Sequence, residues 1–257
     1  MIGFLYWLYE IRLRRQIRAH PSPSHVGIIL DGNRRFARRS GYTNPRAAYD
    51  LGAEKLDDVL AWCIELGIRA VTLWVFSIDN LQRPAEEVSA ILAAVERKIS
   101  ALADDPLIQQ RCIRLKAAGR LDLLPPSTVR VLQTAAEKTA GNDVLTVTIA
   151  IAYGGREEIV DAVRSLIRHK MQQGIELDTM LATISPKDID EHLYTVGLPD
   201  PDLIIRTSGE IRMSGFLLWQ SARSEFYFSD VDWPEFRKVD FLRAVRAFQQ
   251  RHRRFGK

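Results

Sequence analysis

The amino-acid sequence predicts an α/β fold, a single domain with a central, mainly parallel sheet flanked by helices. Short apolar runs of strand length alternate with longer segments whose apolar residues recur at helical spacing. The run at 70–76, Ala-Val-Thr-Leu-Trp-Val-Phe, is apolar almost throughout, as expected of a strand covered on both faces. The chain has 257 residues, of which 46% are hydrophobic, and this is enough for one large domain with its own core.

The predicted elements begin after a linker, Pro21-Ser22-Pro23-Ser24. The helix at 46–66 shows the helical pattern most clearly, with one face formed by Leu51, Leu56, Val59, Leu60, Cys63 and Leu66. Further helices are predicted near 85–102, 126–139, 156–172 and 239–252. Strands are predicted near 26–30, 70–76, 111–116, 144–152, 202–206 and 224–228. Strands and helices that alternate in this way form a mainly parallel sheet.

The segment 1–20 is predicted to form an amphipathic helix that precedes the domain at 25–257. Its first nine residues are apolar and aromatic, and charged residues follow at once. A secretory signal has the reverse order of charge and apolar run, and the run is too short to span a bilayer. A helix packed on the domain or on a partner chain fits this segment, and so does a helix lying on a membrane surface.

Arginine dominates the basic residues, with 28 arginines and 8 lysines among the 36, and the net charge is +4. An excess of arginine favours bidentate binding of phosphate or carboxylate. An excess of arginine also fits a protein that binds nucleic acid or an anionic membrane. The base composition of the genome can produce the same excess without any function. Cys63 and Cys112 form no metal-binding spacing and no disulfide framework, so we expect a cytoplasmic protein.

The stretch 25–41 carries the first candidate site. The apolar run 26–30 stops at Asp31-Gly32-Asn33, and four of the next six residues are arginines that are predicted to begin a helix. A carboxylate at a strand end can hold a hard cation such as Mg²⁺, while backbone amides and guanidinium groups can hold phosphate oxygens. The same residues also fit an ordinary turn followed by a solvated helix face.

Two more polar clusters follow predicted strands. The cluster at 77–83, Ser-Ile-Asp-Asn-Leu-Gln-Arg, follows the second strand, and the cluster at 206–212, Arg-Thr-Ser-Gly-Glu-Ile-Arg, follows the fifth. Ligands of open parallel sheets bind beyond the carboxyl ends of the strands. We therefore expect all three clusters to converge at one edge of the sheet and to form one site.

At these blocks the chain resembles the cis-prenyltransferases, the Z-isoprenyl diphosphate synthases that include undecaprenyl diphosphate synthase. The similarity runs from His25 to about His252, through HVGIILDGNRRFA, FSIDNLQRP, IAYGGREEIVDA, LPDPDLIIRTSGEIRMSGFLLWQSARSEFYF and DVDWPEF. It implies a single α/β domain, usually a homodimer, that condenses isopentenyl diphosphate with an allylic diphosphate and needs Mg²⁺. The all-helical trans-prenyltransferases use a DDxxD motif, which no Asp-Asp pair of this chain completes.

The resemblance implies that the first cluster binds the allylic diphosphate. Asp31 would hold Mg²⁺ against this diphosphate, where negative charge grows as the C–O bond breaks, although a helix N-cap is an alternative role. Phe36, where the family has Trp, would cover the allyl chain or pack in the core. The diphosphate would be cradled by Gly32, Asn33, Arg34 and Arg35.

The other two clusters receive roles in the same way. In the family, the residue at the position of Asn80 is the proton acceptor, but an amide is a poor base. We therefore expect Asn80 to orient the substrate or relay the proton, while a diphosphate oxygen takes the proton. The alternative is that Asn80 is a plain turn residue. Glu225 matches a second Mg²⁺ ligand, which a partner chain could donate, or it is a plain acid at a strand end. His25 is expected to be structural. The remaining substrate-binding residues implied are Ser77, Ile78, Asp79, Leu81, Arg83, Arg206, Arg212, Met213 and Ser214.

Besides Phe36, the sequence departs from the family pattern at four positions. Tyr49 stands where the family has His, and Arg46 is the candidate for a preceding phosphate-binding Arg, with a spacing that differs by one residue. Leu81 stands where long-chain members usually have Trp, and Val75 stands where they often have Ala. A larger side chain at 75 would shorten the tunnel for the isoprenoid, because overpacking a fitted cavity costs about 1–3 kcal/mol.

These departures predict a short-chain enzyme that joins geranyl diphosphate to isopentenyl diphosphate and gives (2Z,6E)-farnesyl diphosphate. The segment 9–13, Tyr-Glu-Ile-Arg-Leu, also resembles short-chain members. One alternative is a medium- or long-chain polyprenyl diphosphate synthase, and another is a non-catalytic prenyltransferase-like subunit, although such subunits lose the Asp and the arginine block that this chain keeps. No nucleic-acid partner is expected, because the chain has no recognised motif for one. We expect a cytoplasmic homodimer and leave contact with the inner face of the cell membrane open.

Overall fold

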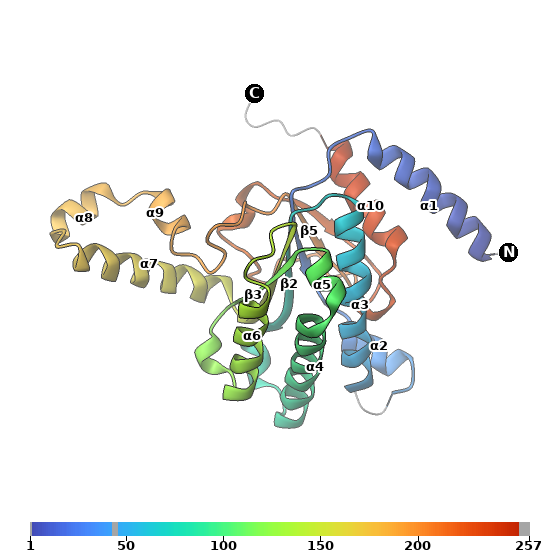
Figure 1. Cartoon of the computed structure of the whole chain (residues 1–257), viewed down its shortest axis with the longest axis horizontal. Coiled ribbons are helices and arrows are strands. Elements are labelled where there is room, and N and C mark those ends of the chain that lie inside the picture. The colour runs from blue at the N-terminus through green and yellow to red at the C-terminus, as the bar shows by residue number, and fades with distance from the viewer. Residues whose placement is uncertain (1, 43–45, 252–257) are drawn as a thin grey trace.

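A sheet of six parallel strands forms the centre of the computed structural model, which describes residues 2–42 and 46–251 (Figure 1). The strands lie in the order β3-β4-β2-β1-β5-β6, and every neighbouring pair is parallel. Their bounds are β1 His25–Ile29, β2 Ala70–Ser77, β3 Ile113–Ala118, β4 Leu145–Tyr153, β5 Leu203–Arg206 and β6 Glu225–Phe228. All carboxyl ends therefore point to the same edge of the sheet.

The structure confirms the predicted fold class and the six predicted strands, whose ends differ from the prediction by at most two residues. Strand β1 lies between β2 and β5, so that Ile28 is opposite Leu73 on one side and opposite Ile205 on the other. Strands from the beginning and the end of the domain thus meet at the centre. Their carboxyl ends bring together segments that are far apart in the sequence.

The predicted long helices are also confirmed, although the end predicted at His252 lies outside the described residues. They are α3 Arg46–Glu65, α4 Ala85–Asp104, α6 Pro126–Lys138, α7 Gly155–Gln172 and α10 Lys238–Gln250. The arginine-rich segment after β1 forms α2 Asn33–Arg39, as expected. Three short helices were not predicted: α5 Pro106–Gln110, α8 Leu177–Thr183 and α9 Pro186–Asp190. Proline at the first position begins α5 and α9, because its fixed φ suits a first turn.

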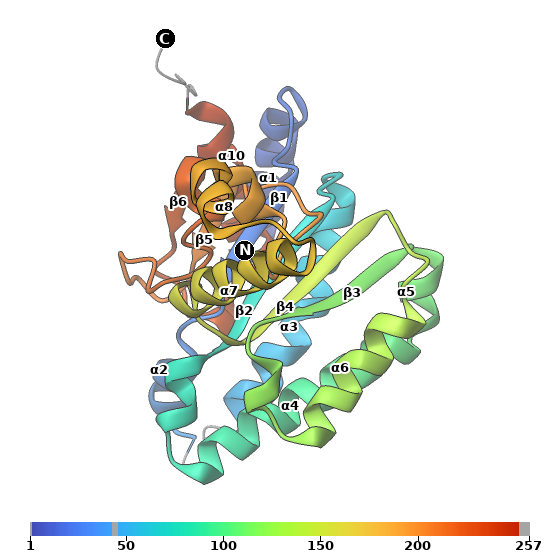
Figure 2. The same cartoon turned by 90° about the vertical axis from the view of Figure 1, so that its left-hand side faces the viewer.

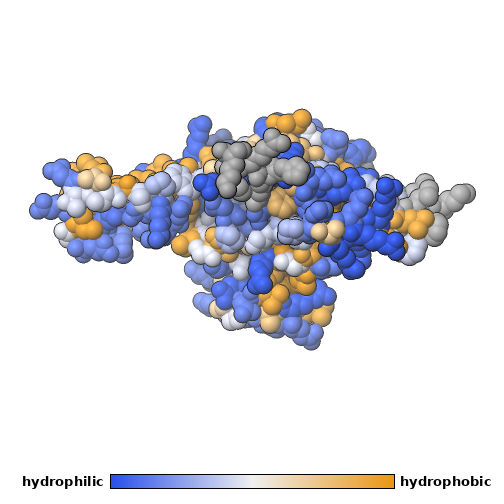
Figure 3. Space-filling model, turned by 90° about the horizontal axis from the view of Figure 1, so that it is seen from above, coloured by the Kyte–Doolittle hydropathy of each residue, from blue (hydrophilic) through white to orange (hydrophobic). Residues whose placement is uncertain are grey.

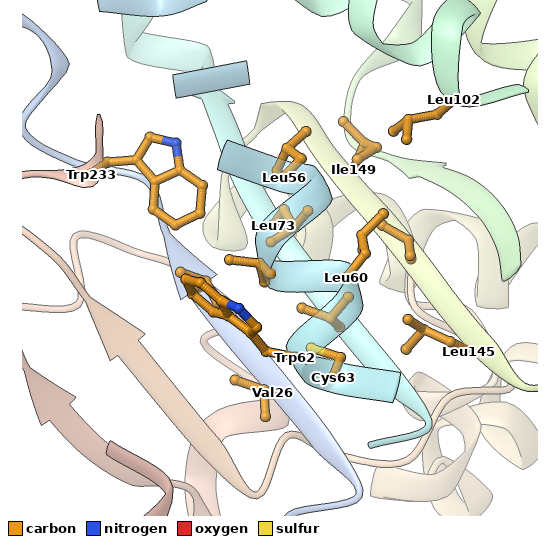
Figure 4. Close-up of a cluster of buried hydrophobic side chains, with 14 of the residues drawn as sticks. Val26, Leu56, Leu60, Trp62, Cys63, Leu73, Leu102, Leu145, Ile149 and Trp233 are labelled. Atoms are coloured by element: carbon orange, nitrogen blue, oxygen red, sulfur yellow. The ribbon is translucent and has the colours of Figure 1, made fainter. Parts of the chain in front are cut away.

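The main core lies on one face of the sheet, between the strands and helices α3, α4, α6 and α10. Figure 4 shows Leu60 and Cys63 of α3 in one buried cluster with Leu73 of β2 and Leu145 of β4. Each fully buried side chain of this size contributes about 1.5–3 kcal/mol. The predicted apolar face of α3 is correct except at its ends, since Leu51 is exposed and Leu66 is only half-buried.

A smaller apolar cluster covers the other face of the sheet. Trp74 of β2 stacks on Phe216 with 5.3 Å between ring centroids, and both rings meet Tyr153 of β4 edge-on. Phe216 belongs to the loop between β5 and β6. The cluster therefore fastens that loop, which follows the third polar cluster, to the sheet.

Helix α1, Ile2–Arg18, packs on α10. Leu13 and Ile17 are fully buried in this contact, and the guanidinium group of Arg243 lies 5.1 Å from the ring centroid of Tyr9. The amino-terminal half of α1 extends past the body of the molecule (Figure 1). Within the described residues, no helix has both the length and the apolar character that a bilayer crossing requires.

Helices α7, α8 and α9 form an arm that projects from the body (Figures 1 and 2). An ion pair of 3.1 Å between Lys170 and Asp188 joins α7 to α9. Apolar side chains are exposed along the arm, with Met171, Leu177 and Leu181 each more than 60% exposed. Figure 3 shows this apolar surface at the end of the arm.

Candidate active site

A polar pocket of about 370 Å³ lies at the carboxyl ends of β1, β2 and β5. The three polar clusters of the sequence converge there, as predicted. Its wall includes the predicted residues Asp31, Gly32, Asn33, Arg34, Arg35, Tyr49, Ser77, Asp79, Asn80, Arg83, Arg206, Arg212 and Ser214. With Arg38, six arginines line this single space together with Asp31, which suits a strongly anionic ligand.

Asp31 and Arg206 form an ion pair at the floor of this pocket. Nη2 of Arg206 donates to Oδ2 of Asp31 at 2.8 Å, and the backbone amide of Gly32 donates to Oδ1 at 2.8 Å. Burial opposes ionisation of Asp31, but the hydrogen bond and charge of Arg206 outweigh it and hold the pKa of the carboxyl below its usual range. Asp31 is therefore a carboxylate at neutral pH, and its side chain keeps 37% exposure toward the pocket.

Glycine is required in the turn that follows Asp31. Gly32 has φ of +106°, a region that L-residues with side chains rarely adopt. A Cβ atom at this position would lie 2.5 Å from Oδ1 of Asp232 and 2.9 Å from its Cα. The turn is therefore packed tightly on the segment before Trp233, whose amide donates to the carbonyl of Asp31 at 3.0 Å.

The second cluster forms a short 3₁₀ helix, η1 Ile78–Gln82, with a reciprocal cap. Oγ of Ser77 accepts from the amide of Asn80 at 3.2 Å, and Oδ1 of Asn80 accepts from the amide of Ser77 at 3.1 Å. Since the amide oxygen of Asn80 is held in this way, its Nδ2 group is the part left to face a ligand. That group can donate a hydrogen bond but cannot accept a proton.

Glu87 of α4 links residues from both sides of the pocket, and the sequence reasoning missed it. Oε1 accepts from the hydroxyl of Tyr49 at 2.7 Å and from Nη1 of Arg83 at 3.0 Å, and it lies 3.8 Å from Nε of Arg34. Burial and the neighbouring Glu87 raise the pKa of Tyr49, so this hydroxyl stays a donor. The spacing of four residues between Arg83 and Glu87 was a signal that the sequence offered.

Arg206 also fastens the third cluster. Its Nη1 donates to the carbonyl of Arg212 at 2.6 Å and to Oγ of Ser214 at 2.7 Å. Glu210 pairs with Arg212 and, at 2.9 Å, with Nη2 of Arg35. The first and third clusters are therefore connected by charged side chains around the pocket.

A small apolar cavity of about 50 Å³ continues from the polar pocket. Leu30, Asn33, Tyr49, Val75 and Ile91 line both spaces. Beyond them the cavity runs between α3 and α4, along Ala53, Leu56, Ala94, Val95, Ile99 and other side chains. The site thus combines an anion-binding mouth with an apolar interior, the form that an amphiphilic ligand requires.

The model of a protein family described as putative undecaprenyl diphosphate synthase matches residues 29–256. The chain belongs to this prenyltransferase family. Membership confirms the resemblance found in the sequence and the predicted enzyme class.

Individual relatives agree with the family. An isoprenyl transferase of Thermus thermophilus is 51% identical over 253 residues, which cover 98% of this chain and 96% of the relative. A (2Z,6E)-farnesyl diphosphate synthase of Thermobifida fusca is 51% identical over 252 residues, which cover 98% and 97%. Among solved structures, lavandulyl diphosphate synthase of Lavandula x intermedia, in complex with dimethylallyl diphosphate, matches with a TM-score of 0.83 and 31% identity, over 92% of this chain and 99% of that one.

Six of the residues predicted for the site do not line the pocket of this prenyltransferase. Ile78 and Leu81 turn to other contacts, and Leu81 packs on the main core. Phe36 packs on Tyr42, with 6.2 Å between ring centroids. The other three are Arg46, which is exposed at the start of α3, the half-buried Met213, and Glu225.

Glu225 lies at the opposite end of the sheet from Asp31. It begins β6 and is in register with Leu203, the first residue of β5, whereas Asp31 follows the carboxyl end of β1. Its carboxylate pairs with Arg251 at 2.5 Å. Within one chain of the prenyltransferase, the structure therefore does not join Glu225 to Asp31.

The donor set of the pocket fits a magnesium ion that is shared with a substrate. Among the residues that the structure describes, no three His, Cys, Asp or Glu side chains group closely enough to hold a metal ion alone. Mg²⁺ is usually bound by one or two carboxylates together with substrate phosphates and water. Asp31, ionised and partly exposed in a pocket lined by six arginines, matches this pattern.

Proposed function

We propose that this prenyltransferase joins geranyl diphosphate to isopentenyl diphosphate and forms (2Z,6E)-farnesyl diphosphate, with release of diphosphate and a proton. One observation carries the proposal: the arginine-rich pocket continues into a small apolar cavity of about 50 Å³, and Val75 lines both spaces. The relative from Thermobifida fusca, named as a (2Z,6E)-farnesyl diphosphate synthase, supports the short product. The related structure that contains dimethylallyl diphosphate supports an allylic diphosphate as one substrate.

In the proposed reaction the first cluster holds the allylic diphosphate. Asp31, the Gly32 turn, Arg34 and Arg35 surround the position of this leaving group. Mg²⁺, bound with the diphosphate at Asp31, supplies positive charge that stabilises the leaving group. The geranyl chain extends into the apolar cavity beside Val75.

The third cluster holds isopentenyl diphosphate. Two arginines and a hydroxyl, Arg206, Arg212 and Ser214, suit a diphosphate bound without metal, and Nε of Arg206 has no acceptor among the described residues. Asn80 orients the substrates through its Nδ2 donor. When the new C–C bond forms, the proton leaves C2 of the isopentenyl group for an oxygen of the departing diphosphate.

A medium- or long-chain polyprenyl diphosphate synthase is the second candidate, because the family model is described by undecaprenyl diphosphate synthase. Incubation of the purified protein with geranyl diphosphate, isopentenyl diphosphate and Mg²⁺, followed by sizing of the products, separates the two. We expect farnesyl diphosphate as the main product. Products that are longer by several isoprene units contradict the short-chain proposal.

The proposed assembly is a cytoplasmic homodimer. The exposed apolar side chains of the arm, such as Leu177 and Leu181, give a second copy a surface to bury, and the two cysteines are free thiols. In such a dimer the partner could bring its Glu225 toward the pocket. Contact with the inner face of the cell membrane is supported by α1, where the exposed Leu8 precedes the exposed Arg12 and Arg15.

A further inference from the structure

Glu158 is a buried carboxylate that the proposed reaction does not use. It lies in the first turn of α7, is 1% exposed, and accepts three hydrogen bonds. The donors are the hydroxyl of Tyr153 at 2.5 Å, the amide of Tyr194 at 2.9 Å and Nε2 of Gln220 at 3.0 Å. Burial raises the pKa of Glu158, and the three donors oppose this rise. A buried acid with so complete a set of partners organises the segments that supply them.

Tyr153 and Gln220 connect this carboxylate to the loop that follows the third cluster. The hydroxyl of Tyr153 accepts from the amide of Leu217 at 3.2 Å, while it donates to Glu158. Gln220, only 4% exposed, also donates to Oγ1 of Thr195 at 2.8 Å. Residues 215–220 are therefore held from the side of β4 and α7.

The same loop carries two side chains of the pocket at its other end. Arg206 holds the carbonyl of Arg212 and Oγ of Ser214. Between the two attachments the backbone is strained, since Ser214 has φ of 53° and Leu217 has φ of 46°. Such residues cost about 1–3 kcal/mol each and persist only where surrounding contacts hold them.

We propose that Tyr153 and Glu158 are positioning residues for the isopentenyl diphosphate site, because they fix the strained loop that presents Arg212 and Ser214. The inference rests on the proposed function of that site. It assigns the two residues no contact with substrate. The allylic diphosphate site, built on β1 and α2, does not depend on this loop to the same extent.

Steady-state kinetics of the full-length protein with Mg²⁺ tests the inference. Tyr153→Phe removes the hydroxyl between Leu217 and Glu158 but keeps the ring that packs on Phe216. We expect the KM for isopentenyl diphosphate to rise about tenfold, while kcat and the KM for geranyl diphosphate change by less than about twofold. The matched control is Tyr194→Phe, which removes a hydroxyl that donates to Asp161 at 2.6 Å and should leave both KM values unchanged.

Hydrogen exchange gives a second readout that is independent of turnover. We expect Tyr153→Phe to speed amide exchange in residues 212–220 while exchange in β1 and β2 stays as in the wild type. Unchanged exchange and an unchanged KM for isopentenyl diphosphate would overturn the inference. If Tyr153→Phe does not fold, Gln220→Met, which removes a donor to Glu158, takes its place with the same expectations and the same overturning result.

Two more variants separate this inference from the function on which it rests. Arg212→Ala and Ser214→Ala should each raise the KM for isopentenyl diphosphate. If they do and Tyr153→Phe and Gln220→Met do not, the positioning role alone is wrong. If they leave that KM unchanged, the assignment of the third cluster to isopentenyl diphosphate is wrong, and the positioning role is overturned with it.

Discussion

Asp31 and Arg206 face each other across the carboxyl ends of β1 and β5, with 2.8 Å between Oδ2 of the carboxylate and Nη2 of the guanidinium group. The same guanidinium group holds Ser214 through its other terminal nitrogen. One arginine thus contacts both halves of the pocket, the half proposed for the allylic diphosphate and the half proposed for isopentenyl diphosphate. In the proposed reaction, a magnesium-bound diphosphate at Asp31 would share this carboxylate with Arg206.

Replacement of Asp31 tests its proposed role in metal binding. Asp31→Asn keeps an acceptor for Arg206 but removes the negative charge, so we expect turnover to fall by about 10²–10³-fold, as when a strong electrostatic contact to a transition state is lost. Circular dichroism should show an unchanged fold. Glu235→Gln is the control, since Glu235 is an exposed acid that pairs with Arg39 outside the pocket wall. Activity near that of the wild type in Asp31→Asn contradicts the role.

Gly32→Ala should impair both stability and activity. The added Cβ would collide with Asp232, and the left-handed φ is unfavourable for alanine, so the free energy of unfolding should fall by more than about 1 kcal/mol. Gly41→Ala is the matched control, because Gly41 also has a positive φ, of +74°, but open space around its Cα. Urea unfolding measures both variants. Equal losses would show that the contact with Asp232 has no effect.

Val75→Ala should lengthen the product. Val75 lines both the polar pocket and the apolar cavity, so a smaller side chain opens the passage between them. Val71→Ala, in the same strand but outside both cavities, loses the same atoms from the core and should leave the product unchanged. Chromatography of dephosphorylated products measures their lengths. An unchanged product from Val75→Ala removes the argument that this side chain limits elongation.

A mixing experiment tests whether Glu225 acts across a dimer. Asp31→Ala and Glu225→Gln chains should each have low activity alone. If a partner donates Glu225, mixed dimers contain one pocket with both acids intact, so mixing and re-equilibrating the two variants should restore part of the activity. Gel filtration checks that dimers form. Full activity of Glu225→Gln alone would show that its pair with Arg251 is merely structural.

His25 should make stability depend on pH. It is buried between the carbonyl of Pro199, 2.6 Å from Nδ1, and the hydroxyl of Thr72, 2.9 Å from Nε2. Burial lowers the pKa of His25 from 6.5, so the unfolded chain binds the proton more readily than the folded protein does. The contribution of neutral His25 to the free energy of unfolding is complete above pH 6.5. It is lost as the pH falls toward the lowered pKa of the folded protein, by at most about 1.4 kcal/mol per pH unit.

Urea unfolding at a series of pH values checks this prediction. His25→Gln should have a lower free energy of unfolding at neutral pH. As the pH falls below 7, its free energy of unfolding should decline less than that of the wild type, because the contributions of the other titratable groups are the same in both proteins. His20→Gln, at an exposed position, is the control and should follow the wild type. Parallel pH profiles of the wild type and His25→Gln would contradict a buried neutral imidazole.

The sequence predicted the strands and long helices well because their buried apolar residues form continuous strand-length runs or recur at helical spacing. Val71 and Leu73 in the second strand are examples, and both are fully buried. The sequence could not give the order of the strands, which depends on packing between distant segments. The short helices α8 and α9 were missed because five to seven residues carry too little periodicity.

The polar half of the site was predictable for a related reason. Asp31 and Asn80 follow β1 and β2, Arg206 is the last residue of β5, and parallel strands bring such positions together. The sequence could not give the direction of Phe36, which depends on how α2 packs; its ring contacts Tyr42 and does not line the pocket. The sequence also indicated no role for Glu158, because two of its three partners, Tyr194 and Gln220, are distant in the sequence.

The position of β1 at the centre of the sheet has a consequence for how the protein is made. Val26 pairs with Leu203, so one side of the first strand finds its neighbour only after nearly two hundred further residues have left the ribosome. Until then that apolar strand keeps an open edge, which is prone to association with other nascent chains. Translation that stalls before the fifth strand therefore yields a chain that lacks Arg206, the partner of Asp31, and we expect chaperones to shield it.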